Sequence, residues 1–127
     1  MFAKVVRDAD RIDILRIIAE QLEKPLEPGK EAVFLYLDES VEIDDAVFTA
    51  VSKGNMVERK DLHGRADFLC MILSWIEIMN FQCSCRIIQR AGEYHSLLEH
   101  LPRNSRGKRV RDIFLGSMKR RLEQTGG

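Results

Sequence analysis

The sequence predicts one all-α domain spanning residues 1–127, folded as a compact helical bundle. Apolar residues recur every three or four positions along most of the chain, as on the buried face of a helix. Only three prolines occur, and no repeat or low-complexity tract marks a linker. A content of 45% hydrophobic and 31% charged residues is typical of a soluble globular domain and excludes a disordered chain.

The first segment is predicted to form a helix over residues 3–23, which ends before Pro25. The apolar positions that support it are Val5, Ala9, Ile12, Ile14, Ile18 and Leu22. No capping residue precedes this helix, and Val5 and Val6 leave an apolar surface that needs a covering partner. We therefore expect a homo-oligomer that buries the N-terminal helix.

The middle of the chain is predicted to contain a loop, a short apolar segment and two helices. Residues 24–29 form the loop, and residues 32–37 form either a helical turn or a strand, of which the turn is favoured. A helix capped by Ser40 should end at Gly54. Residues 61–79 should form one long central helix, apolar nearly all round in its second half and therefore surrounded by neighbours.

The last third is predicted to form three further helices. They cover residues 86–91, residues 93–101 before Pro102, and residues 106–123. The longest apolar stretch, residues 68–79, is too short to cross a bilayer and contains Glu77, so no membrane partner is expected.

Three carboxylates interrupt the apolar pattern of the first helix. With about 100° of rotation per residue, Asp10 and Asp13 share a face while Asp8 points away from Asp10. At most two of the three can therefore bind one metal ion. The alternative is a solvated helix face on which Arg7 and Arg11 pair with the aspartates at i,i+3 or i,i+4 spacing.

Residues 6–13, Val-Arg-Asp-Ala-Asp-Arg-Ile-Asp, resemble the late aspartate motif of the HD-domain metal-dependent phosphohydrolases. The resemblance implies a partial HD-domain-like fold in which Asp10 binds a divalent cation (Mn, Ni, Zn, Fe or Mg). It also implies that Asp8, Asp13 and Arg11 support that ligand or contact substrate. The implied reaction is hydrolysis of a phosphoester in a phosphorylated small molecule such as a nucleotide. Further strings resemble the helical C-terminal part of one bacterial branch of the family: Gly54-Asn55-Met56-Val57 with Asp61, Leu73-Ser74-Trp75-Ile76, and Asn80-Phe81.

The chain departs from this family because it contains no His-Asp dipeptide. In the family, that pair and a further histidine supply the other metal ligands. One carboxylate does not hold a catalytic cation against water, so we expect the chain to be inactive as it stands. Two explanations stay open: upstream sequence is missing, or the chain is a degenerate relative that kept the scaffold.

Two other functions are alternatives to this phosphohydrolase interpretation. The first is a non-catalytic helical oligomerisation or interaction module. The second is nucleic-acid binding through the basic residues Arg106, Lys108, Arg109 and Arg111, which we consider less favoured because no aromatic residues alternate with them for base stacking. Balanced totals of twenty acidic and twenty basic residues also give the whole chain no preference for polyanions.

The histidines and cysteines are not expected to carry chemistry. His95 and His100 are five residues apart and fall on different helix faces, and His63 is expected at the surface. Cys83 and Cys85 have the wrong spacing for a Cys-x-x-Cys motif. Three cysteines are too few for a disulfide framework, which predicts a cytoplasmic protein.

Overall fold

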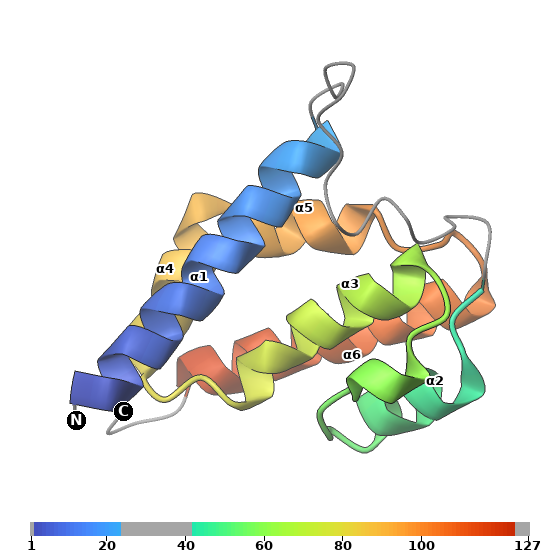
Figure 1. The fold of residues 1–127 in the computed structure, drawn as a ribbon, viewed down its shortest axis with the longest axis horizontal. Coiled ribbons are helices and arrows are strands. Elements are labelled where there is room, and N and C mark those ends of the chain that lie inside the picture. Colours follow the sequence, from blue (N-terminus) through green and yellow to red (C-terminus); the bar gives the residue numbers. More distant parts are fainter. Residues whose placement is uncertain (1, 24–41, 124–127) are drawn as a thin grey trace.

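The computed structural model describes residues 2–23 and 42–123, and in these residues it contains helices and no strand (Figure 1). This confirms the predicted all-α class. In chain order the elements are α1 (Phe2–Glu23), α2 (Asp45–Ser52), the 3₁₀ turn η2 (Arg59–Asp61), α3 (Arg65–Leu73), the 3₁₀ turn η3 (Ser74–Glu77), α4 (Gln82–Ala91), α5 (Glu93–Glu99) and α6 (Ser105–Glu123).

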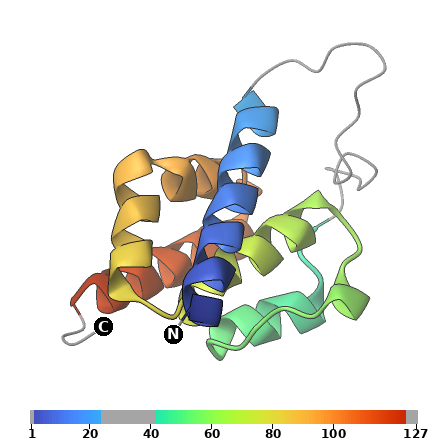
Figure 2. The same ribbon diagram turned by 60° about the vertical axis from the view of Figure 1, so that its left-hand side comes forward.

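Helix α6 packs against α2, η3 and α4, while α3 contacts α2 and α5. Helix α1 lies along one edge of the molecule, where it contacts α4 and α5 (Figures 1 and 2). One apolar core joins these elements, and its largest fully buried side chains include Leu69, Ile72, Leu73, Ile76, Ile88, Leu97, Leu98 and Val110. Burial of each such side chain contributes about 1.5–3 kcal/mol, so this core supplies most of the driving force for folding.

Tyr94 links α5 to α6 by a hydrogen bond within the core. Its side chain is fully buried, and its hydroxyl donates a hydrogen bond of 3.1 Å to the Phe114 carbonyl oxygen. Burial raises the pKa of Tyr94 well above its ordinary value, so the hydroxyl stays a neutral donor. A buried tyrosine normally needs such a partner for its polar end.

The prediction of one continuous helix over residues 61–79 is wrong. Helix α3 begins later than predicted, at Arg65, and gives way to the 3₁₀ turn η3 after Leu73. Asp67 accepts hydrogen bonds from the backbone N–H groups of Asp44 and His63, and this holds residues 62–64 outside α3. At the other end, the Ser74 hydroxyl donates to the Met71 carbonyl oxygen at 2.6 Å, and the chain tightens into η3. Side-chain hydrogen bonds to nearby backbone groups compete with α-helix in this way.

The helix predicted from Ser40 also starts later than expected. Residues 42–44 are not helical, and Asp44 caps α2 by accepting a 2.9 Å hydrogen bond from the Ala46 N–H. The predicted end is close to the observed one, since Gly54 follows the helix with a φ of +70°. The apolar run at residues 32–37 lies outside the described residues.

The remaining helices match their predictions apart from their ends. Helix α4 begins four residues earlier than predicted, at Gln82, and α5 ends at Glu99 rather than at residue 101. None of the described helices has both the length and the apolar character to cross a membrane.

Candidate metal-binding face of helix α1

Asp8 is the most heavily bonded of the three N-terminal aspartates. Only 2% of the residue is exposed, and its carboxylate lies against the turn that joins η3 to α4. Its Oδ1 accepts hydrogen bonds from the backbone N and the Nδ2 of Asn80, both at 2.9 Å. Its Oδ2 accepts from the Phe81 N–H at 3.1 Å and from the Ser84 hydroxyl at 2.5 Å. The carboxylate therefore caps the start of α4 from a helix more than seventy residues away in sequence.

These hydrogen bonds decide the charge state of Asp8. Burial alone would raise the pKa of its carboxyl, but the donors of Asn80, Ser84 and Phe81 together hold that pKa below its ordinary value of 3.8. Asp8 is consequently an anion near neutral pH. The positive end of the α4 dipole adds to this preference.

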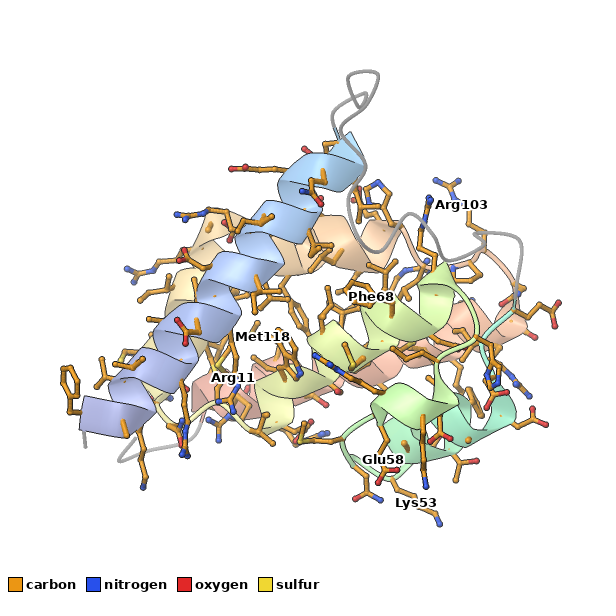
Figure 3. All side chains as sticks on the ribbon, in the orientation of Figure 1. Arg11, Lys53, Glu58, Phe68, Arg103 and Met118 are labelled. Atoms are coloured by element: carbon orange, nitrogen blue, oxygen red, sulfur yellow. The ribbon has the colours of Figure 1, made fainter. Side chains whose placement is uncertain are left out.

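Arg11 completes the contact between α1 and the same turn. Its Nη1 donates to the Ile78 carbonyl oxygen at 3.3 Å and lies 3.5 Å from Asp8 Oδ1 (Figure 3). This is one of the i,i+3 pairs that the alternative reading of the acidic motif predicted. That Asp8 and Arg11 also support a metal ligand or contact substrate stays a prediction.

The opposite side of α1 is exposed and mostly apolar. We call it the outer face, and it carries Phe2, Val6, Asp10, Asp13, Ile14 and Ile17. Exposure reaches 82% for Phe2, 41% for Val6 and 45% for Ile17. Asp13 is bound to Arg16 by a 2.6 Å ion pair, whereas Asp10 makes no ion pair within residues 2–23 and 42–123. Asp10 is thus a carboxylate without a partner of this kind in an exposed apolar surface.

Asp8 is buried and Asp10 is exposed, so the two carboxylates lie on opposite sides of α1, as the helical rotation predicts. The described residues contain no group of three or more His, Cys, Asp or Glu side chains arranged to hold a metal. Any co-ligand of Asp10 within this part of the chain is therefore limited to one further side chain of these types. The divalent cation implied by the family resemblance stays a prediction.

A second buried carboxylate, that of Asp67, was not singled out by the sequence analysis. Asp67 is fully buried and accepts hydrogen bonds from the N–H groups of Asp44 at 2.8 Å and His63 at 2.9 Å. The His63 ring lies at the surface, as predicted, with Nδ1 3.4 Å from Asp44 Oδ1. Asp67 lies in the first turn of α3, where the positive end of the helix dipole favours a carboxylate.

The basic residues of α6 do not form one surface. The Nη1 of Arg106 donates to the Ile43 carbonyl oxygen at 2.8 Å and to Asp45 at 2.7 Å, and its guanidinium lies 4.8 Å from the Phe48 ring centroid. Arg111 donates to backbone carbonyl oxygens at the end of α5, while Lys108 and Arg109 are exposed. Two of the four predicted contacts for nucleic acid are thus engaged in holding helices together.

No family model, curated protein or solved structure matches this chain.

Proposed function

We propose that α1 contributes one ligand to an HD-type metal-dependent phosphohydrolase site. Asp10 is that ligand, and the other ligands come from a chain segment that packs on the outer face of α1. The observation that carries this proposal is the position of Asp10, exposed and without an ion-pair partner in the described residues, among exposed apolar side chains.

The apolar side chains favour a covering segment. Removing Phe2, Val6 and Ile17 from water would stabilise the covered state by up to about 1.5–3 kcal/mol for each side chain. The same cover takes Asp10 out of water. A carboxylate that loses its hydration at an apolar interface is destabilised by several kcal/mol unless a cation or hydrogen-bond donors compensate it. A divalent cation bound by Asp10 provides that compensation.

The chemistry follows from the cation once it has further ligands. A divalent ion polarises a phosphoryl oxygen and lowers the pKa of bound water, and together these effects hydrolyse a phosphoester. The substrate class is a phosphorylated small molecule. Since the described residues supply only Asp10 and the ion-paired Asp13 on this face, they are expected to be inactive without the covering segment.

Metal content tests this proposal. The protein is purified from its natural source, so that any chain that packs on α1 is retained. It is then offered Mn²⁺, Ni²⁺ and Zn²⁺, and its metal content is measured by elemental analysis. Bound metal that disappears in Asp10→Ala, together with hydrolysis of a chromogenic phosphate monoester, is the expected result. Glu20→Ala, which removes another exposed acid of α1, should retain the metal. Absence of metal from the natural protein, or metal retained by Asp10→Ala, would refute the proposal.

The outer face also favours a second candidate function, a self-associating helical module without catalysis. Ile87 on α4, a helix that contacts α1, is a further exposed apolar side chain. In this case the protein associates in the presence of EDTA. Sedimentation velocity should show dimers or larger species that Ile17→Glu abolishes and that the control Leu115→Glu on α6 preserves. A monomer at every concentration would exclude the module.

A further inference from the structure

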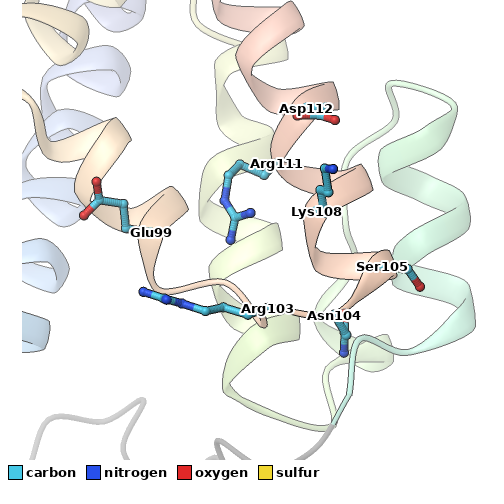
Figure 4. A pocket seen from close by; sticks show the side chains of 7 residues that line it. All are labelled: Glu99, Arg103, Asn104, Ser105, Lys108, Arg111 and Asp112. Carbon is cyan, nitrogen blue, oxygen red and sulfur yellow. The ribbon is translucent and has the colours of Figure 1, made fainter.

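We propose that a pocket between α5 and α6 binds a small anion carrying a phosphate or pyrophosphate group. We call it the α5–α6 pocket. It has a volume of about 760 Å³, and its walls come from α5, the connection to α6 and the first turns of α6 (Figure 4). The residues that line it are Glu99, Arg103, Asn104, Ser105, Lys108, Arg111 and Asp112.

Arg111 is the fixed cation of this pocket. Its Nε donates to the Leu98 carbonyl oxygen at 3.2 Å, and its Nη2 lies 3.5 Å from the Leu101 carbonyl oxygen. Its Nη1 makes no hydrogen bond within the described part of the chain. The guanidinium is therefore held by one edge on the end of α5, and a free edge remains for a ligand. A planar guanidinium presented in this way suits the oxygens of a phosphate group.

Two further cations stand at the rim. Arg103 extends from the connection and Lys108 from α6, and both are exposed (Figures 3 and 4). Neither forms an ion pair with any described residue, and the same holds for the rim carboxylates Glu99 and Asp112. With Arg111, the lining carries three cations and two carboxylates, a net charge of +1, and the rim groups are not fixed in ion pairs with described residues.

The backbone that carries these residues is closely packed. A Cβ added to Gly107 would lie 1.9 Å from the Pro102 carbonyl oxygen, so the connection rests directly on the first turn of α6. Asn104 fixes that turn, because its Oδ1 accepts from the Gly107 N–H at 2.8 Å and its backbone oxygen accepts from the Lys108 N–H at 3.0 Å. The backbone between Asn104 and Lys108 is thereby held in place before a ligand arrives, which lowers the entropic cost of binding.

The charge distribution favours a compact anion over a nucleic-acid strand. Three cations and two carboxylates line one hollow. An extended polyanion would have to pass Glu99 or Asp112, where like charges repel it. A single phosphate or pyrophosphate group needs to contact only Arg111 and one rim cation, so it does not have to lie against both carboxylates.

Binding of inorganic phosphate and pyrophosphate, followed by isothermal titration calorimetry, tests the proposal. We expect saturable binding that Arg103→Gln or Lys108→Gln weakens about tenfold, since a charge-assisted hydrogen bond to phosphate is worth about that factor. Lys119→Gln is the control, because it removes an exposed cation of α6 outside the pocket. Both pocket variants alter exposed side chains, and their unchanged thermal unfolding will show that the fold is intact.

Three results would overturn the assignment. The first is no saturable binding of either anion. The second is equal weakening by Lys119→Gln, which would indicate diffuse attraction to α6. The third is tighter binding of a single-stranded oligonucleotide than of pyrophosphate, with little dependence on Arg103.

Discussion

Replacing Asp8 by alanine should destabilise the fold far more than replacing either neighbouring aspartate. The substitution leaves the N–H groups of Asn80 and Phe81 and the hydroxyl of Ser84 without their acceptor. A hydrogen bond to a charged group contributes about 1.5–3 kcal/mol, and loss of a helix cap costs about 1–2 kcal/mol. Because these contributions share one carboxylate they do not add fully, and we expect a loss of about 3–4 kcal/mol in the free energy of unfolding.

Urea denaturation followed by circular dichroism measures this loss. With a slope of about 2 kcal/mol per molar urea, the transition midpoint of Asp8→Ala should fall by about 1.5–2 M. The matched controls Asp10→Ala and Asp13→Ala change exposed side chains of the same helix and should stay within about 0.5 kcal/mol of the unsubstituted protein. If Asp8→Ala unfolds at the same midpoint as these controls, the Asp8 carboxylate does not cap α4.

The lowered pKa of Asp8 gives this stabilisation a pH dependence. A group whose pKa is depressed in the folded state contributes stability above its unfolded pKa, here 3.8, and the contribution disappears as the pH falls through the folded pKa. The difference in stability between the unsubstituted protein and Asp8→Asn should therefore be constant near neutral pH and shrink below about pH 3.8. A difference that persists unchanged into strong acid would contradict the assigned charge state.

Three other predictions concern buried polar groups, backbone packing and thiols. Asp67→Ala should lower the free energy of unfolding by about 2–4 kcal/mol because two buried N–H groups lose their acceptor, and a loss below 1 kcal/mol in urea denaturation would be inconsistent with these bonds. Gly107→Ala should lower the thermal midpoint, since the new methyl group meets the backbone of the preceding connection; an unchanged midpoint would show that the connection yields freely. Cys83 should react with a thiol reagent in the native protein, whereas buried Cys70 and Cys85, whose thiol pKa values burial raises, should react only after unfolding; immediate labelling of all three would contradict the described packing.

The helical class and most helix positions could be predicted because apolar periodicity and prolines act locally. The ends of the central helix could not, since they depend on side-chain hydrogen bonds to backbone groups, some local and some between residues distant in sequence. Asp67 receives the N–H of Asp44, twenty-three residues away, and Asp8 caps a helix that starts more than seventy residues later. The local pattern of residues 61–79 does not indicate these partners.

The candidate site could be predicted only in part, because its geometry also depends on contacts between helices. Helical rotation alone separates Asp8 from Asp10, and the structure places them on opposite sides of α1. Which of the two faces the core depends on how α1 packs on α4 and α5, which rotation does not specify. The four basic residues of α6 that the sequence offers for nucleic acid also have different neighbours, since Arg106 reaches α2 and Arg111 reaches the end of α5.

Manganese-induced line broadening in ¹H–¹⁵N spectra of the natural protein tests most directly whether Asp10 is a metal ligand. Paramagnetic Mn²⁺ broadens the amide signals nearest to it, so we expect broadening centred on residues 6–14 of α1 that disappears in Asp10→Ala and persists in Glu20→Ala. Broadening centred on another part of the chain, or equally strong in Asp10→Ala, would show that Asp10 is not the metal ligand.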